Sequence, residues 1–174
     1  MSTESLRYAR TLDDSVDGIL DRYATMVYRL AFARTKSHYD ADDVLQEVFL
    51  RYIRSAPLFV EEEHRKAWLI RTTINCSKTM LTSAWMRKVV PLEDTLVTQM
   101  KEHSEVYYAV LALPQKYRTV IHLFYYEDYS VAEIAQLLDC REATVKSQLF
   151  RARNMLRNQL KGDNYDVQGQ LPFG

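Results

Sequence analysis

The chain has 174 residues, enough for one or two small domains, and 47% of them are hydrophobic, so it can bury a core. Its 23 basic and 23 acidic residues give a formal net charge of zero, so any charged binding surface has to be local. No apolar run approaches the roughly 20 residues that span a membrane, and none of the glycines lies between Gly18 and Gly162, which excludes the glycine-rich loops that cradle phosphates.

The first predicted domain contains three or four helices, and three of them are expected at residues 16–35, 40–55 and 64–86. In the first helix, apolar residues recur with helical spacing, which predicts one inward face. That face consists of Ile19, Tyr23, Met26, Val27, Leu30 and Ala31. Pro57 follows the second helix and marks its end, because proline cannot continue a helix.

The predicted helix at 40–55 has two distinct faces. Its inward face should consist of Leu45, Val48, Phe49 and Tyr52. A second face, here called the docking stripe, carries Asp43, Gln46, Glu47 and Leu50 at positions i, i+3, i+4 and i+7. Two interpretations fit the stripe: a polar docking surface for a basic partner helix, with Leu50 as an apolar anchor, or an ordinary solvated face.

The predicted helix at 64–86 is basic. Residues 64–88 include six Lys or Arg and no acid, and Trp68 near their start is expected to pack in the core. Small polar side chains accompany the bases, namely Thr72, Thr73, Asn75, Ser77 and Thr79. This composition suits a nucleic-acid backbone, and the Asn75 amide offers a paired donor and acceptor that can read a base edge. Contact with an acidic surface such as residues 61–63 is the alternative.

We expect two small all-helical domains joined by a flexible linker. Apolar periodicity lapses after residue 86, so we assign residues 1–86 to the first domain, 87–104 to the linker, 105–161 to the second domain and 162–174 to a loose tail. The second domain should begin with helices at 105–111 and 114–126, since Pro114 suits a first helical turn. No additional regulatory domain is expected at either end.

A helix-turn-helix should follow. Ser130 and Glu133 form a capping-box pattern ahead of an apolar run, and Asp139 can adopt a left-handed turn. The first helix should bury Val131, Ile134, Ala135 and Leu138. The second should bury Val145, Leu149, Ala152 and Leu156. Two helices joined by so short a turn fit the helix-turn-helix arrangement.

The outer face of the second helix is basic. It carries Ala143, Lys146, Ser147, Phe150, Arg151 and Asn154. Residues 141–161 include six bases and one acid, a net charge of +5, so a neutral chain can still present a basic edge to a nucleic acid. The alternative is a solvated basic helix that binds nothing.

The cysteines and the N-terminus indicate the compartment. Cys76 and Cys140 each lie in a helical pattern, as small apolar residues do in a reducing compartment. The first ten residues have no apolar signal core, so we expect a cytoplasmic protein without membrane insertion. Four scattered histidines and two cysteines do not form a metal site. We therefore expect no cofactor, and no catalytic motif is present that would indicate an enzyme.

Three segments together resemble the extracytoplasmic-function group of bacterial sigma factors. The family's core-binding helix resembles Asp40-Ala-Asp-Asp-Val-Leu-Gln-Glu-Val-Phe49. Its promoter-melting helix is similar to Trp68-Leu-Ile-Arg-Thr-Thr-Ile-Asn75. Its C-terminal helix-turn-helix domain resembles Leu113-Pro-Gln-Lys-Tyr-Arg118 together with residues 130–153. The segments occur in the family's order over residues 16–160, and their combination in one short chain is specific.

The resemblance implies a sigma factor that binds core RNA polymerase, recognises the −35 and −10 promoter elements, melts the start region and then leaves. The docking stripe would bind the polymerase clamp. The unpaired non-template strand of the −10 element would be engaged by Arg71, Asn75 and Lys78. The −35 duplex would be faced by a set here called the recognition stripe: Arg141, Thr144, Lys146, Ser147, Phe150 and Arg151. An anti-sigma factor is a further partner that the resemblance suggests without requiring.

Several residues depart from the family's pattern. Asp139 and Ala143 stand where the family has glycine, and Arg141 stands where Ser or Pro is common. The loop at 57–63, where the family's base-reading segment lies, is acidic here, and the resemblance does not say which of its residues reads a base. Two other functions are open: a stand-alone helix-turn-helix regulator that does not bind core polymerase, and an adaptor whose basic faces bind acidic proteins. Only the sigma factor requires a complex with core polymerase.

Overall fold

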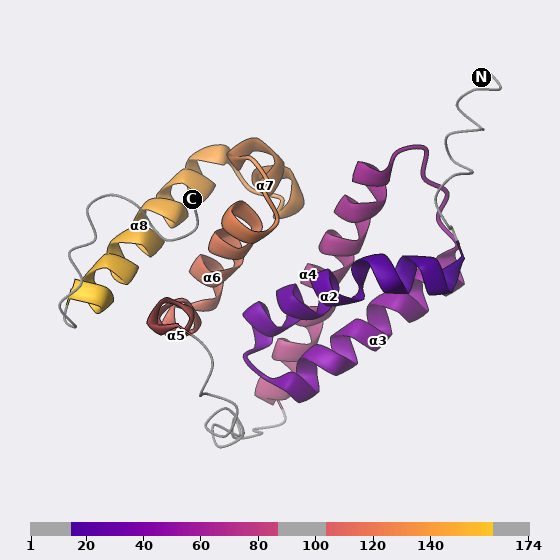
Figure 1. The fold of residues 1–174 in the computed structure, drawn as a ribbon, viewed down its shortest axis with the longest axis horizontal. Coiled ribbons are helices and arrows are strands. Elements are labelled where there is room, and N and C mark those ends of the chain that lie inside the picture. Colours follow the sequence, from indigo (N-terminus) through magenta and orange to yellow (C-terminus); the bar gives the residue numbers. More distant parts are fainter. Residues whose placement is uncertain (1–14, 87–103, 162–174) are drawn as a thin grey trace. The chain divides into compact units, whose positions relative to one another are not determined.

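The computed structural model describes residues 15–86 and 104–161 of the chain. Its elements are α2 (Val16–Thr35), α3 (His38–Ser55), α4 (Glu62–Met86), α5 (Glu105–Ala112), α6 (Gln115–Ile121), η3 (His122–Tyr126), α7 (Val131–Leu137) and α8 (Glu142–Lys161) (Figure 1). The chain divides into two compact units, unit 1 at residues 1–89 and unit 2 at residues 90–174. The predicted all-helical fold with two small domains is therefore confirmed. No described helix is long and apolar enough to cross a membrane.

The predicted segments between and after the domains fall largely outside the described residues. This applies to residues 1–14, to the linker predicted at 87–104 except for Ser104, and to the tail predicted at 162–174. Ser104 caps α5, because its Oγ accepts a hydrogen bond from the Tyr107 N–H at 3.4 Å. The exact domain boundaries stay a prediction.

A short polar turn, Lys36-Ser37, joins α2 to α3 in unit 1. Ser37 caps α3, its Oγ accepting from the Asp40 N–H at 3.1 Å, so α3 begins two residues before the predicted start at 40. Lys36 and Ala56 end α2 and α3 in the left-handed region, with φ values of 58° and 39°. The left-handed residue at the end of α2 lets α3 begin only two residues later.

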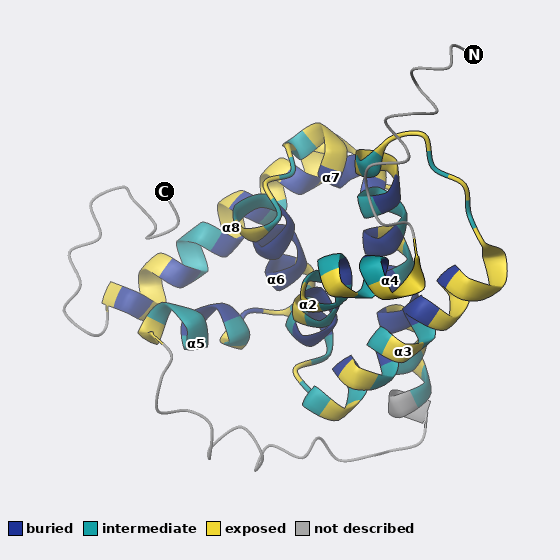
Figure 2. Ribbon diagram, turned by 45° about the vertical axis from the view of Figure 1, so that its right-hand side comes forward, coloured by how far each residue is buried: buried dark blue, intermediate teal, exposed yellow. Residues whose placement is uncertain are grey.

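The core of unit 1 lies where α2, α3 and α4 pack against one another, and the dark-blue stripes of Figure 2 mark their buried faces. Its largest fully buried side chains are Ile19, Val27, Leu30, Val44, Leu69 and Ile70. The predicted inward faces of α2 and α3 are confirmed except at Met26 and Leu45, which are half-buried. The buried faces also include residues that the prediction left out, Phe32 and Arg34 on α2 and Ala41 and Val44 on α3.

Unit 2 differs from the prediction at 114–126, where one helix was expected. The chain is α-helical to Ile121 and then winds as a π-helix, with the Glu127 N–H donating to the His122 carbonyl at 3.2 Å. A π turn brings residues five apart together. Glu127 Oε1 accordingly lies 3.3 Å from His122 Nε2. Apolar spacing cannot reveal this change, because a single turn is too short to show a period.

Arg118 joins α5 to α6 inside unit 2. Its guanidinium is 5% exposed and donates to the carbonyl oxygens of Leu111 and Leu113 at the end of α5. Burial lowers the pKa of Arg118 to about 10. The apolar core around this contact consists of Leu113, Ile121, Leu123, Ile134, Leu149 and Leu156. These residues hold α8 against the rest of the unit.

Candidate functional site

The turn before α8 has the predicted geometry. The Ser130 N–H donates to Glu133 Oε2 at 2.8 Å and the Glu133 N–H donates to Ser130 Oγ at 3.3 Å, which completes the capping box at the start of α7. Asp139 has a φ of 51°, and the Cys140 N–H donates to the Ala135 carbonyl at 2.9 Å. The left-handed residue and this hydrogen bond fix the direction in which α8 leaves the turn.

The recognition stripe lies on the exposed side of the α8 segment. The four residues predicted to face inward are buried, while Lys146, Ser147, Phe150 and Arg151 are exposed. Phe150 is 64% exposed, which is unusual for a large aromatic side chain. Arg141 and Thr144 are exposed beside them. All six residues of the recognition stripe are therefore accessible, and the five that belong to α8 share its outer face.

One base of α8 does not belong to this surface. Arg153 Nε donates to the Tyr125 hydroxyl at 2.8 Å, and its guanidinium lies 5.5 Å from the ring centroid of Phe124. The predicted charge of +5 therefore overstates the basicity of the outer face.

Two residues of α6 lie next to the recognition stripe, the exposed Lys116 and the buried Tyr117. A hydrogen bond from Arg151 lowers the pKa of Tyr117, and Lys116 Nζ lies 5.0 Å from the Tyr117 ring centroid. The sequence gives no local signal for these neighbours, because α6 and α8 come together only in the folded unit.

The docking stripe is accessible on α3 of unit 1. Gln46 and Leu50 are exposed, and Asp43 and Glu47 are half-buried. Glu47 Oε1 accepts a hydrogen bond from Arg51 Nε at 2.7 Å, an ion pair in which both side chains stay partly exposed. The four predicted residues therefore share one accessible face.

Two further apolar residues lie along the same side of α3. Tyr39 is 76% exposed and Ile53 is 50% exposed. Positions 39, 46 and 53 are seven residues apart, as are 43 and 50, which is the spacing of a coiled-coil seam. The docking stripe thus continues over four turns as an accessible seam with apolar residues toward both ends. The sequence spacing alone could have identified Tyr39 and Ile53.

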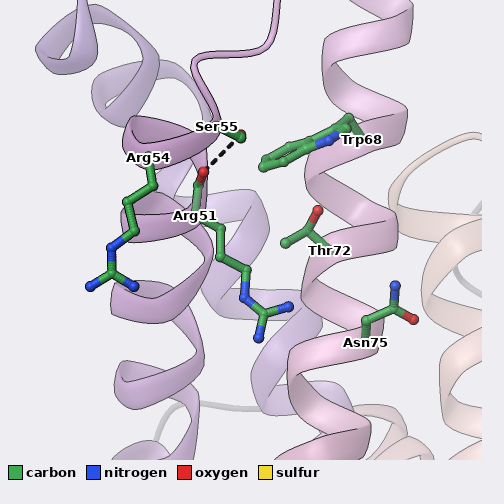
Figure 3. A pocket seen from close by; sticks show the side chains of 6 residues that line it. All are labelled: Arg51, Arg54, Ser55, Trp68, Thr72 and Asn75. Carbon is green, nitrogen blue, oxygen red and sulfur yellow. Dashed lines mark hydrogen bonds between the residues drawn. The ribbon is translucent and has the colours of Figure 1, made fainter.

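A hollow of about 430 Å³ opens between α3 and α4, here called the α3–α4 hollow. It is lined by Arg51, Arg54, Ser55, Trp68, Thr72 and Asn75 (Figure 3). In the close-up, the Arg51 side chain extends between the two helices, and the Trp68 ring reaches from α4 toward Ser55. The hollow therefore combines an aromatic ring, an amide and two guanidinium groups from neighbouring helices. Arg51 and Arg54 were not among the predicted site residues.

The −10 residues predicted on α4 lie on one exposed face. Arg71, Asn75 and Lys78 are exposed and stand at i, i+4 and i+7. Thr73 and Ser77 do not join them, which corrects the expectation that they offer hydrogen bonds to a ligand. Both are fully buried, and their hydroxyls donate to backbone carbonyls four residues earlier at 2.7 Å.

The cysteines differ from one another. Cys76 is buried and Cys140 is half-buried, so the prediction of two buried thiols holds for Cys76 only. Burial raises the pKa of both thiols, which keeps them protonated and unreactive near neutral pH. Within residues 15–86 and 104–161, no cluster of three His, Cys, Asp or Glu side chains could hold a metal ion.

Known protein families match both units. Residues 19–87 match the family described as Sigma-70 region 2, and residues 103–156 match the one described as Sigma-70, region 4. An ECF RNA polymerase sigma-E factor of Haemophilus influenzae is 31% identical over 165 residues, which cover 82% of this chain and 86% of that protein. The ECF RNA polymerase sigma factor SigW of Bacillus subtilis is 28% identical over 173 residues, which cover 85% of this chain and 90% of that protein.

The fold is also similar to solved structures. One is the sigma factor RpoE in a co-crystal with the anti-sigma factor NepR from Bartonella quintana, with a TM-score of 0.65 and 20% identity over 83% of this chain and 95% of that one. Another is CnrH in complex with the cytosolic domain of CnrY, with a TM-score of 0.63 and 20% identity over 93% of this chain and 99% of that one.

Proposed function

This chain belongs to the extracytoplasmic-function group of RNA polymerase sigma factors, and from that premise we propose which of its surfaces meets the polymerase and which meet the two promoter elements. As a sigma factor it binds core RNA polymerase and directs promoter-specific initiation of transcription. A stand-alone helix-turn-helix regulator would need unit 2 only. The match of residues 19–87 to Sigma-70 region 2 disfavours that alternative.

The docking stripe on α3 is the proposed polymerase-binding surface. Its seven-residue spacing suits a partner that presents helices, because a seam of this period packs against a coiled coil. The acids Asp43 and Glu47 would pair with basic residues of that partner. The apolar contact area would come from Tyr39, Leu50 and Ile53. We assign this partner to the clamp region of the polymerase.

The α3–α4 hollow is the proposed site for an unpaired base of the −10 element. A base taken out of the stack needs an aromatic or apolar side chain on its flat face and hydrogen-bonding groups at its edge. Trp68 can provide the face and Asn75 the edge, while Arg51, Arg71 and Lys78 offer cations to the neighbouring phosphates. The volume of about 430 Å³ falls in the range of about 300–1,000 Å³ that is usual for small-molecule sites.

The recognition stripe is the proposed −35 surface, entering the major groove as the second helix of a helix-turn-helix does. Arg151 and Ser147 are exposed on the outer face of α8 and would meet base edges. Lys146, which lies 4.0 Å from Glu142, and Arg141 at the start of the helix would meet phosphate. Phe150 would contact the methyl group of a thymine.

Other parts of the proposal concern partners and compartment. The polymerase supplies the catalytic chemistry, so the chain itself contributes no catalytic group and needs no cofactor. It would act in the cytoplasm, where the core polymerase and the chromosome are found. An anti-sigma factor is a candidate partner, because the similar folds of RpoE and CnrH were solved with NepR and with the cytosolic domain of CnrY.

The observation that carries this assignment is that the docking stripe, the α3–α4 hollow and the recognition stripe are all accessible in one chain. The experiment that tests it is transcription in vitro with core polymerase and a genomic library, with start sites mapped by sequencing. Start sites that share one −35 and one −10 sequence support the proposal. Start sites identical to those of core polymerase alone would contradict it.

A further inference from the structure

The loop between α3 and α4, residues 56–61, has two half-buried residues, Pro57 and Phe59. Leu58 is 98% exposed and Val60 is 75% exposed, whereas Phe59 between them is half-buried. Phe59 is therefore directed toward the protein while Leu58 and Val60 on either side of it face solvent. The placement of this loop therefore depends strongly on what holds Phe59.

Phe59 lies between a cation and a wall of the α3–α4 hollow. The Arg65 guanidinium carbon lies 5.7 Å from the centroid of the Phe59 ring. The Trp68 ring meets Phe59 edge to face, with centroids 6.3 Å apart. Trp68 also meets Tyr52 edge to face, at 5.7 Å. Two aromatic rings thus contact Trp68, and it lines the hollow.

Arg65 is itself fixed by a carboxylate at the start of α4. It is 6% exposed and its Nη1 donates to Glu62 Oε2 at 2.6 Å. The other oxygen of Glu62 accepts from Arg22 Nη1 at 3.1 Å and from the Tyr23 hydroxyl. Burial, and then the hydrogen bond to Glu62, raise the pKa of Tyr23, so its hydroxyl stays protonated as a donor. Contacts thus run without a break from α2 through Glu62, Arg65 and Phe59 to Trp68.

We propose that Glu62 and Arg65 are positioning residues for reading the −10 element: they hold Phe59, and through it Trp68, in the orientation that receives an unpaired base. This inference rests on the proposed role of the α3–α4 hollow. The proposal also explains one acid of the segment at 57–63 that departs from the family's pattern. Glu62 accepts a hydrogen bond from Arg65, and it does not contact the nucleic acid.

A purely stabilising role explains the arrangement less well. The ion pair of the buried Arg65 with the half-buried Glu62 adds little net stability, because the loss of hydration offsets most of the attraction. A planar guanidinium, by contrast, has a fixed direction and can set the orientation of the ring beneath it. Apolar residues of similar volume would fill the same space without fixing the angle of Phe59.

The experiment uses holoenzyme assembled from core polymerase and the full chain, and a pool of promoter duplexes randomised in the −10 segment. Arg65→Gln removes the cation over the ring and leaves Glu62 paired with Arg22 and Tyr23. Phe59→Leu keeps an apolar side chain but removes the flat ring, and it leaves no charge unpaired. Val27→Ala is the matched control, because Val27 is fully buried in the core of the same unit and belongs to α2, outside the loop.

Both test variants should bind core polymerase within about twofold of wild type and form about tenfold fewer open complexes, the effect of losing one base–aromatic contact. Sequencing of the bound pool should show a flattened base preference at one −10 position. Val27→Ala should keep that base preference even if its unfolding temperature falls by as much as that of the two test variants. An unchanged preference in Arg65→Gln and Phe59→Leu, or an equal flattening in Val27→Ala, would overturn the positioning role.

Asn75→Ala in the same selection separates this inference from the proposed function. If Asn75→Ala changes the preference while Arg65→Gln and Phe59→Leu do not, the hollow reads DNA and only the positioning role fails. If none of these variants changes the preference, the assignment of the hollow fails together with the positioning role.

Discussion

Replacing Leu50 and Ile53 with alanine should weaken binding to core polymerase by roughly 10- to 100-fold. The two side chains are 43% and 50% exposed in the free chain, and a partner helix on the docking stripe would cover that area. Fully burying such a side chain contributes about 1.5–3 kcal/mol. The exposed halves of two side chains therefore contribute about 1.4–2.8 kcal/mol together, and each 1.4 kcal/mol corresponds to about a factor of ten in Kd.

The assay is a titration of fluorescently labelled chain with core polymerase, followed by anisotropy, with circular dichroism to confirm the helical fold. Leu58→Ala is the matched control, because Leu58 is 98% exposed and lies outside α3. It makes the same chemical change away from the docking stripe and should leave the affinity unchanged. The reasoning is refuted if the double variant binds within twofold of wild type, or if Leu58→Ala loses as much affinity.

Three further predictions concern DNA and stability. Asn75→Ala should reduce permanganate reactivity of melted thymines much more than it reduces closed-complex binding, because a base can be held in the hollow only when it is unstacked; equal losses in the two assays would argue against base recognition. Arg151→Ala should cost about 1–3 kcal/mol of binding free energy on the preferred −35 sequence and relax the base preference there. Lys146→Ala should instead weaken binding to all sequences alike and flatten the slope of log K against log salt by roughly one unit. Identical behaviour of the two variants would contradict this division of roles. Hydrogen bonds from Ser130 lower the pKa of Glu133 from 4.5, so the contribution of Glu133 to stability is complete above pH 4.5 and is lost as the pH falls through the lowered pKa. Urea unfolding should show that Glu133→Gln is less stable than wild type at neutral pH and that this difference shrinks in acid. A difference in stability that does not depend on pH would refute the assignment.

Periodicity and caps made much of this fold predictable. The start and end of α2 agree with the prediction, and so do the capping box at Ser130 and the left-handed turn at Asp139. These features depend on residues within one or two turns of each other, so the local sequence contains the information. The apolar pattern predicts a start of α3 at residue 40, whereas the helix begins at His38 because Ser37 caps it.

Features that depend on contacts between helices were not predictable in the same way. The α3–α4 hollow requires Arg51 and Trp68 from different helices, and no sequence spacing reports that distance. Thr73 and Ser77 look like ligand groups by composition, but the position of the core places them inside. The sequence count also includes Arg65 among the bases that α4 offers to a nucleic acid, but Arg65 is buried and pairs with Glu62.

The distribution of charge explains how a chain with no net charge can bind both a polymerase and DNA. Attraction between exposed charges is largely screened beyond about 8 Å at physiological ionic strength, so each partner senses the local face and not the total. The acids of the docking stripe lie on α3 in unit 1, while the recognition stripe presents Arg141, Lys146 and Arg151 on unit 2. Affinity for DNA grows with the number of phosphates that are neutralised, and the exposed bases of the recognition stripe, with Lys116 beside it, neutralise few. Unit 2 by itself should therefore bind DNA weakly at physiological salt, and selective promoter binding should require both units to be joined through the polymerase.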